Sequence, residues 1–245
     1  MEHLEQFYDE LSSSYTELIS KCVPRYHEML FNMFRYIPES FKPKRIIDLG
    51  CGTGNLTQEI LNHYPDAEIY ALDLSEDILG ECKKRFPNAE NISYIKADFK
   101  QMSLDSNAYD LVMSSIAIHH VEDSFKIQLY QDVYSALRYN GLFIFADQTR
   151  GITDEIYKKN ISCWKDEAIK LGSTEENWKM WIEHQDAHDH HSPVGWHLHQ
   201  LENAGFNKVD LLSKYLMWGV FWAKKIMKNA EQTDPLQGQI SLKVN

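Results

Sequence analysis

The sequence predicts an α/β protein built on a doubly wound, mostly parallel sheet of seven strands that ends in an antiparallel hairpin. From residue 45 onward, short β-branched runs alternate with longer amphipathic runs, which is typical of βαβ units. A turn with three alternating glycines, at 50–54, follows the first of these runs. The chain has 245 residues, of which 43% are hydrophobic, enough for one large α/β domain but not for a second full one.

The elements expected before and within the sheet follow from hydrophobic spacing. Apolar residues at helical intervals over 3–37 predict two helices, so we assign residues 1–44 to an N-terminal segment that caps the ligand site. Asn140-Gly141 is a C-cap signal for the last helix within the sheet. The expected strands are 45–49, 68–72, 93–97, 110–114 and 142–146, and the expected helices between them are 54–64, 76–85 and 124–139.

The segment after the fifth strand departs from this alternation. Residues 148–192 form a polar insert that predicts helices at about 152–171 and 174–187, which we place as a lid above the carboxyl edge of the sheet. The insert contains tryptophans that can line an acceptor pocket or form the core of the lid: Trp164, Trp178 and Trp181.

The C-terminal part returns to the sheet. Ser192-Pro193 predicts an N-cap and a first-turn proline for a helix that closes at Ala204-Gly205. Two further runs, 209–215 and 219–224, predict the hairpin. The main domain therefore spans 45–224, and residues 225–245 form a polar tail.

Charge and cysteine usage restrict the function. Lys and Arg number 25 against 36 Asp and Glu, and the net charge of −11 disfavours nucleic acid as a partner. The four cysteines form no C-x-x-C pair, which favours free thiols in a reducing cytosol. The acidic N-terminus and a longest apolar run of only nine residues, 215–223, predict neither a signal peptide nor a membrane span. We therefore expect a soluble, cytoplasmic protein. A homodimer is compatible with the sequence, which does not determine the oligomeric state.

The glycine turn is the strongest single signal. Glycine has no Cβ, so this turn can adopt positive φ and let a nucleotide-like ligand lie on the backbone beside the positive end of the next helix. A dinucleotide fingerprint, G-x-G-x-x-G, would require a third glycine where Asn55 stands. The actual spacing is G-x-G-x-G, headed by Asp48, and it resembles motif I of the class I S-adenosylmethionine (SAM) methyltransferases.

Residues that follow the strands are the candidates for ligand contacts, because the ligand of a doubly wound sheet lies across the carboxyl ends of its strands. Asp73 can accept both ribose hydroxyls, Asp98 can accept an adenine amino hydrogen, and Phe99 can pack on the base. The alternative for such an acid is a turn or cap role, since Asp73 precedes Ser75 at a plausible helix start. The predicted cofactor-binding residues are Asp48, Gly50, Cys51, Gly52, Thr53, Gly54, Asp73, Leu74, Asp98, Phe99, Ser114 and Ser115.

Four stretches resemble motifs I to IV of the class I methyltransferases: DLGCGTG at 48–54, ALDLSEDIL at 71–79, ADF at 97–99 and DLVMSSIAIHHV at 110–121. This resemblance covers about 45–150 and implies a Rossmann-like fold, SAM as cofactor and S-adenosylhomocysteine as product. Residues 22–26, the insert and 201–224 are similar to the carboxy-SAM synthases and their methyltransferase relatives. In that branch the tyrosine that matches Tyr26 reaches the ligand, so the resemblance adds Tyr26 to the site.

The chemistry needs few catalytic groups. Methyl transfer is an in-line displacement at a sulfonium carbon, so alignment of the nucleophile and exclusion of water can supply much of the catalysis. A base is needed only if the nucleophile must lose a proton, and the candidates are His119 and His120, after the fourth strand. The alternative is that either one packs structurally under the insert. Instead of a DPPY-type tetrapeptide the chain has Ser114-Ser115-Ile116-Ala117, which disfavours enzymes that methylate amino groups of DNA bases.

Three functions remain consistent with the sequence: a SAM-dependent methyltransferase with a small-molecule acceptor, a carboxy-SAM synthase, and a SAM-binding protein without catalysis. The resemblance implies that carboxy-SAM synthases read the added carboxylate with an arginine from the insert region. This chain has no arginine after Arg150, and a lysine would offer a point charge without the bidentate fork. We therefore expect a methyltransferase with a small-molecule acceptor.

Histidines gather near the end of the insert. His184 and His188 are four apart and would share a helix face, and Asp186 and Asp189 add carboxylates, so a divalent metal site is conceivable. The alternative is a polar loop and helix face over the pocket, and on spacing alone we predict no metal site. The cluster comprises His184, His188, His190, His191, His197 and His199.

Overall fold

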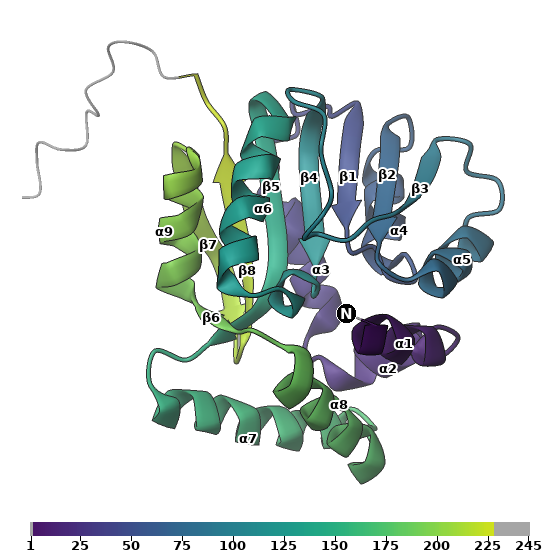
Figure 1. The fold of residues 1–245 in the computed structure, drawn as a ribbon, viewed down its shortest axis with the longest axis vertical. Coiled ribbons are helices and arrows are strands. Elements are labelled where there is room, and N and C mark those ends of the chain that lie inside the picture. The colour runs from purple at the N-terminus through teal and green to yellow at the C-terminus, as the bar shows by residue number, and fades with distance from the viewer. Residues whose placement is uncertain (1, 228–245) are drawn as a thin grey trace, which may run out of the picture.

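The computed structural model describes residues 2–227 and contains one sheet flanked by helices (Figure 1). Seven strands follow the order β3-β2-β1-β4-β5-β8-β7, in which β1 to β5 pair parallel and β8 pairs antiparallel with both β5 and β7. The predicted α/β fold with a closing hairpin is confirmed, and a two-residue strand, β6, is an additional eighth strand at the end of β5. The strands are β1 Arg45–Leu49, β2 Glu68–Asp73, β3 Ile92–Lys96, β4 Tyr109–Ser115, β5 Leu137–Arg150, β6 Ser192–Pro193, β7 Lys208–Tyr215 and β8 Trp218–Lys224.

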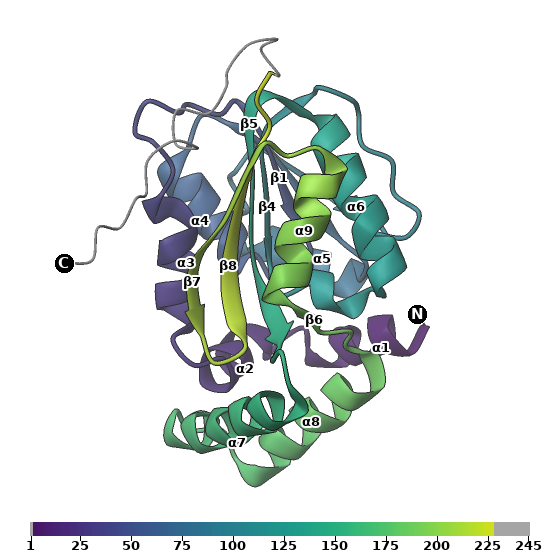
Figure 2. The ribbon, with the colours of Figure 1, turned by 90° about the vertical axis from the view of Figure 1, so that its left-hand side faces the viewer.

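Helices cover both faces of the sheet (Figure 2). Successive side chains of a strand point to opposite faces, so Ile46 of β1 packs into one hydrophobic core and its neighbour Ile47 into the other. The core around Ile46 receives side chains from α3, α4 and α5, and the core around Ile47 receives them from α6 and α9. These helices are α3 Tyr26–Arg35, α4 Asn55–His63, α5 Glu76–Arg85, α6 Asp123–Ala136 and α9 Val194–Ala204.

The remaining helices lie below the carboxyl edge of the sheet, where the strand arrows of Figure 1 point. We call α1 (Glu2–Leu11) and α2 (Tyr15–Cys22) the cap, and α7 (Asp154–Lys170) and α8 (Glu175–His188) the lid. Both views place the cap between the sheet edge and the lid.

Two hydrogen bonds join the lid to the cap. The buried Trp164 indole Nε1 donates to the Cys22 carbonyl at 2.7 Å, and the Ser173 hydroxyl donates to the Lys21 carbonyl at 3.2 Å. All three tryptophans of the lid are buried, and the Trp164 and Trp178 rings meet edge to face. The tryptophans of the lid therefore belong to the same hydrophobic core as Ile46, and the lid is tied to α2.

The N-terminal segment forms three helices, although the hydrophobic spacing predicts two. The first break follows Leu11, where the Ser14 hydroxyl donates to the Leu11 carbonyl at 3.3 Å. Serine side chains compete in this way with helical hydrogen bonds, and the run at 12–14 is all serine. The second break contains Pro24 and Arg25, and Arg25 takes a left-handed φ of 58°.

The predicted boundary near Asn140-Gly141 is wrong. Helix α6 ends at Ala136, because Leu137 already pairs with Tyr109 as the first residue of β5. Asn140 takes a left-handed φ of 68°, and its N–H donates to the Lys225 carbonyl at 2.7 Å. The Asn-Gly signal therefore marks an irregularity inside a long strand instead of a helix end.

The helix after the lid begins one residue later than its sequence signal suggests. Ser192 and Pro193 form β6, and Pro193 is the N-cap residue of α9 instead of its first helical residue. The predicted C-cap is confirmed, since Gly205 closes α9 with a φ of 114°. Most of the predicted tail, from 228 onward, lies outside the described residues. Within residues 2–227, no helix is both long enough and apolar enough to cross a membrane.

Candidate functional site

The glycine turn between β1 and α4 is held against the ends of β2 and β4. Gly50, Gly52 and Gly54 all have positive φ, at 70°, 56° and 88°. The Gly50 N–H donates to the Leu72 carbonyl at 2.8 Å, and the Gly52 N–H donates to the Asp73 carboxylate at 2.9 Å. The backbone of this turn is thus fixed by strand β2, which holds its concave side open to a ligand.

Asp48 has a structural position. Its side chain is fully buried at the end of β1, where Oδ2 accepts a hydrogen bond from the Thr57 hydroxyl of α4 at 2.6 Å. Burial raises the pKa of this carboxyl to about 7. Asp48 lines none of the cavities at this edge, and it anchors the start of α4 to the sheet.

An Asp48→Asn variant tests this pKa. A folded-state pKa raised above the unfolded value means that the folded protein holds an extra proton, so stability falls as pH rises from about 4 to about 7 and then levels off. The amide keeps the Thr57 hydrogen bond and does not titrate. We expect the ligand-free variant to match the wild type below about pH 4 and to exceed its stability increasingly up to about pH 7. Urea unfolding at several pH values measures the difference in unfolding free energy between the two proteins. A difference that does not change with pH would contradict the raised pKa.

A cavity of about 730 Å³, including its open mouth, lies beside the glycine turn; we call it the edge cavity. Gly50, Asp73 and Phe99 line it on the sheet side, and Tyr8 and Tyr15 of the cap line it opposite. The sequence-predicted Gly52, Leu74 and Asp98 also line it. The Asp73 carboxylate already accepts N–H groups from Gly52 and Ser75 at 2.9 and 3.1 Å, and it retains acceptor positions for further hydrogen bonds.

A second cavity, the turn cavity, lies on the other side of the glycine turn and has a volume of about 310 Å³. Tyr26 of α3, Asn55 of α4 and Ser115 of β4 line it, together with Cys51 and Thr53. The Tyr26 hydroxyl accepts from the Asn55 amide at 3.2 Å. The Ser115 hydroxyl is buried and has no hydrogen-bond partner among the described residues. A polar group of a ligand would satisfy it.

A third cavity of about 350 Å³, the lid cavity, lies between the sheet edge and the lid. Trp164 and Trp181 form its apolar wall. Its polar wall consists of His119, His120, Gln148, Gln185 and Asp189.

The three cavities meet at two residues, Tyr15 of the cap and Ile116 after β4, which line all of them. Ile116 has a left-handed φ of 55°, which is strained for a β-branched side chain. Its N–H donates to the Ala146 carbonyl at 2.8 Å, so β5 holds the strained residue in place.

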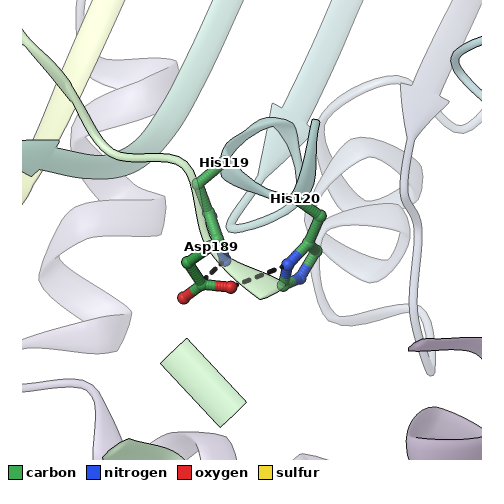
Figure 3. Close-up of side chains that lie close together, drawn as sticks. All are labelled: His119, His120 and Asp189. Atoms are coloured by element: carbon green, nitrogen blue, oxygen red, sulfur yellow. Dashed lines mark hydrogen bonds and ion pairs between the residues drawn. The ribbon is translucent and has the colours of Figure 1, made fainter. Parts of the chain in front are cut away.

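The two predicted histidines lie side by side on a 3₁₀ turn, Ile118–His120, after β4 (Figure 3). His119 is buried, and its Nδ1 hydrogen bonds to the Asp147 carboxylate at the end of β5. His120 bonds at Nδ1 to Asp189 at 3.0 Å and at Nε2 to the Tyr8 hydroxyl of the cap at 2.7 Å. The pair thus connects the sheet with the cap and with the end of the lid.

The surroundings of His119 and His120 shift the pKa values of the two imidazoles in opposite directions. Burial lowers the pKa of His119, but the carboxylates of Asp147 and Asp189 outweigh it, and the net shift is upward. Burial and the neighbouring His119 lower the pKa of His120. Burial would also raise the pKa of Asp189, but the imidazoles of His119 and His120 hold it well below its usual range.

These cavities fit SAM by their donors and acceptors. The edge cavity offers carboxylates and an aromatic ring for a nucleoside, the glycine turn leaves room for close contact, and the turn cavity offers the free Ser115 hydroxyl for an amino acid group. An alanine at position 50 would place its Cβ 2.3 Å from the Ala117 Cβ. The contact between the glycine turn and Ala117 is therefore too close for any residue larger than glycine.

Comparison with known proteins agrees with this geometry. A family described as a methyltransferase domain matches residues 46–141. A solved SAM-dependent methyltransferase from Mesorhizobium loti is 25% identical, with a TM-score of 0.57 over 81% of this chain and 96% of that chain. We call residues 46–141 the methyltransferase domain after this family match. A phosphoethanolamine N-methyltransferase 2 of Haemonchus contortus, solved with SAM, shares the fold of the domain at 16% identity, with a TM-score of 0.66 over 89% of this chain and 57% of that chain.

Two curated relatives cover different parts of the chain. A malonyl-[acyl-carrier protein] O-methyltransferase of Ilyobacter polytropus is 29% identical over 45% of this chain, and this alignment spans 40% of the relative, so the likeness covers less than half of either protein. A carboxy-SAM synthase of Campylobacter hominis is 24% identical over 90% of this chain and 94% of its own length. An alignment of this length includes the lid, whichever end of the chain it leaves out.

The structure distributes the predicted site residues unevenly around the methyltransferase domain. Most of them line a cavity, whereas Asp48, Gly54 and Ser114 line none of the three. The Ser114 hydroxyl donates to the Leu49 carbonyl at 2.7 Å, so it faces the neighbouring strand. Sequence reasoning missed Tyr8, Tyr15 and Asp147. Asp147 ends β5 just as Asp73 ends β2, so the strand-end rule could have found it.

Proposed function

We propose that this protein transfers a methyl group from SAM to a small-molecule acceptor bound in the lid cavity. The observation that carries the proposal is the meeting of the three cavities at Tyr15 and Ile116. A nucleoside in the edge cavity and an amino acid group in the turn cavity would bring the sulfonium that joins them to this junction. The lid cavity would then present the acceptor from the opposite side, as an in-line displacement requires.

The dimensions of the lid cavity support a small acceptor. Buried Trp164 and Trp181 close it on one side, and the cap closes it on another. Its volume of about 350 Å³, which includes space open to solvent, leaves no room for a folded macromolecule. The net charge of −11 likewise disfavours a nucleic-acid substrate.

Bound SAM would supply an electrophilic methyl group, and the protein would supply alignment and a site closed to water. We assign His119 and His120 to the acceptor side, where they contact and orient its nucleophilic atom. Tyr15 and Ile116 would fix the line between that atom and the methyl group. The Tyr8 hydrogen bond to His120 would keep the cap closed during the reaction.

The decisive experiment detects turnover instead of binding. The protein is incubated with SAM and fractions of a metabolite extract, and S-adenosylhomocysteine is quantified by mass spectrometry. We expect at least one fraction to raise its release above the level seen without extract. An Asp73→Asn variant serves as a control for contaminating enzymes. Equal release with and without every fraction would favour a SAM-binding protein without catalysis.

A carboxy-SAM synthase is the second candidate, because the relative from Campylobacter hominis aligns over 90% of the chain. An arginine that could grip an added carboxylate is missing from the walls of all three cavities over residues 2–227. Arg150 instead pairs with Asp154 and stacks over the Tyr157 ring, at 4.7 Å from its centroid. We therefore expect no carboxylated product from SAM and prephenate. Detection of that product by mass spectrometry would reverse the ranking of the two candidates.

A further inference from the structure

The polar wall of the lid cavity holds a compact group of potential metal ligands. His119 Nε2, His120 Nδ1 and a carboxylate oxygen of Asp189 all lie within 4.8 Å of one another (Figure 3). Their side chains are only 4%, 11% and 3% exposed. Two come from the 3₁₀ turn after β4 and the third follows the last helix of the lid, so folding alone brings them together.

We propose that His119, His120 and Asp189 bind a divalent first-row transition-metal ion, with His184 and His191 able to complete its coordination. Imidazole ligands suit ions such as Zn²⁺, Co²⁺ and Fe²⁺, whereas Mg²⁺ and Ca²⁺ prefer oxygen ligands. The site is independent of the predicted SAM contacts, because none of its five residues lines the turn cavity and only His120 reaches the edge cavity.

The distances match those between neighbouring ligands of one ion. Metal–ligand bonds of about 2.0–2.1 Å in tetrahedral geometry place ligand atoms about 3.3 Å apart. The Asp189 oxygens lie 3.0 Å from His120 Nδ1 and 3.7 Å from His119 Nε2. The same carboxylate lies 3.5 Å from His191 Nε2 and 3.8 Å from His184 Nε2. The ligand atoms of His119, His120 and Asp189 lie within 4.8 Å of one another, so rotations of these side chains would bring them to bonding distance of a shared ion.

A second layer of hydrogen bonds orients three of the imidazoles, as is usual for histidine ligands. The nitrogen of each ring that faces away from the ion has its own partner. His119 Nδ1 bonds to the Asp147 carboxylate, and His120 Nε2 bonds to the Tyr8 hydroxyl at 2.7 Å. His191 Nδ1 bonds to the Tyr157 hydroxyl at 2.8 Å, whereas its Nε2 bonds to Gln148 Oε1 at 2.5 Å and would exchange that partner for the ion.

The fourth imidazole, that of His184, lacks a hydrogen-bond partner among the described residues. The His184 side chain is 3% exposed, yet neither of its ring nitrogens has a hydrogen-bond partner within the described chain. The Phe7 ring stacks on it at a centroid distance of 4.0 Å and fixes its plane. Leaving such a group unpaired is costly, and a metal ion beside Asp189 would satisfy its Nε2.

The charges of the buried side chains also favour a bound cation at this position. Asp147 and Asp189 place two carboxylates in this buried region, and one Asp147 oxygen has no hydrogen-bond partner among residues 2–227. The nearby ammonium of Lys126 is engaged by Asp123 at 3.1 Å and by Ser192 at 2.8 Å. Buried carboxylates are stable when a cation balances them, and the bound ion would provide that cation.

The candidate ligands that lie together in the structure differ from the pair that helical spacing suggests, His184 and His188. The compact group consists of His119, His120 and Asp189, and the His184 ring lies beside it, with its centroid 5.4 Å from that of His120 and 5.1 Å from that of His188. His197 lies on the other face of the sheet, where its Nδ1 bonds to the Tyr130 hydroxyl at 2.7 Å. His199 is exposed on α9 and lies outside the cluster. His199 therefore offers a matched control.

An ion at this position would face the lid cavity and could coordinate an oxygen or nitrogen atom of the acceptor. This part of the inference rests on the proposed methyl transfer, whereas metal binding itself does not. The histidines would then act on the acceptor through the ion, which lowers the pKa of a bound hydroxyl or amine.

The test uses the full chain without a His-tag, stripped with a chelator and studied without SAM. Titration with Zn²⁺ by calorimetry and with Co²⁺ by visible absorption should each show one ion per chain, with Co²⁺ bands of a four- or five-coordinate site. Asp189→Asn and His119→Gln should each weaken Zn²⁺ binding at least tenfold, and His199→Gln should leave it unchanged. S-adenosylhomocysteine binding by each variant verifies that the protein is folded.

The outcomes separate the two proposals. Substoichiometric Zn²⁺ in the wild type, or equal affinity in wild type and a folded Asp189→Asn variant, would overturn the metal site. One ion per chain without release of S-adenosylhomocysteine from any extract fraction would support the metal site and count against methyl transfer. Release of S-adenosylhomocysteine by a protein that binds no ion would support methyl transfer and overturn the metal site.

Discussion

Replacing Gly50 with alanine is expected to destabilise the ligand-free protein by roughly 3 kcal/mol, from a left-handed backbone and a steric clash together. Gly50 has a φ of 70°, and an added Cβ would lie 2.3 Å from the Ala117 Cβ and 3.3 Å from the Phe99 ring. Ala117 belongs to the segment after β4, so relief of the clash would pull the glycine turn away from that strand. Urea unfolding without ligand measures the loss, and S-adenosylhomocysteine binding should be lost as well.

Gly52 provides the matched control for this substitution. Its φ of 56° is also left-handed, but an added Cβ would meet only the Tyr15 ring, at 3.6 Å. Gly52→Ala should therefore carry the backbone cost alone, roughly 1 kcal/mol. Equal losses in the two variants would show that backbone conformation, and not the approach of Ala117, sets the need for glycine at 50.

An Asp73→Asn substitution is expected to weaken S-adenosylhomocysteine binding at least about 100-fold. Two hydrogen bonds from ribose hydroxyls to a carboxylate are worth about 1.5–3 kcal/mol each, and an amide can accept with only one of its two heteroatoms. The amide nitrogen would also face the N–H of Gly52 or Ser75, which the carboxylate now accepts at 2.9 and 3.1 Å. The turn itself would then be disturbed.

Calorimetric titration of both proteins with S-adenosylhomocysteine gives the ratio of affinities. Asp77→Asn is the control, because Asp77 lies exposed in the first turn of α5 and lines none of the three cavities. It makes the same change in net charge close to the site. An Asp73→Asn affinity within threefold of the wild type would mean that Asp73 only shapes the turn and does not hold the ribose.

Local patterns predict which residues gather beside the glycine turn. A strand, a glycine turn and a helix start are determined by neighbouring residues, and the parallel order of the strands brings Asp73 and Asp98 to the same edge. The same periodicity also limits the prediction for Ser114 and Ser115. Successive strand residues point to opposite faces, so both hydroxyls could not face one ligand. The structure places Ser115 in the turn cavity and turns Ser114 toward Leu49.

The acceptor half depends on contacts between distant segments, which periodicity cannot reveal. Tyr8, His120 and Asp189 come from α1, the turn after β4 and the end of the lid, and only the folded chain brings them together. The spacing of His184 and His188 pointed to one helix, whereas the cluster draws on several elements. Residue type marked these histidines as notable, but it could not select their partners.

The hydrogen bonds from the lid to α2 have a kinetic consequence. Trp164 and Ser173 attach the lid to the end of α2, and Tyr15 at the start of the same helix borders both the edge cavity and the lid cavity. A movement that opens the lid therefore pulls on the wall that encloses the cofactor. Under the proposed reaction, both products would depart through a single opening event, and the frequency of that event would limit the turnover number.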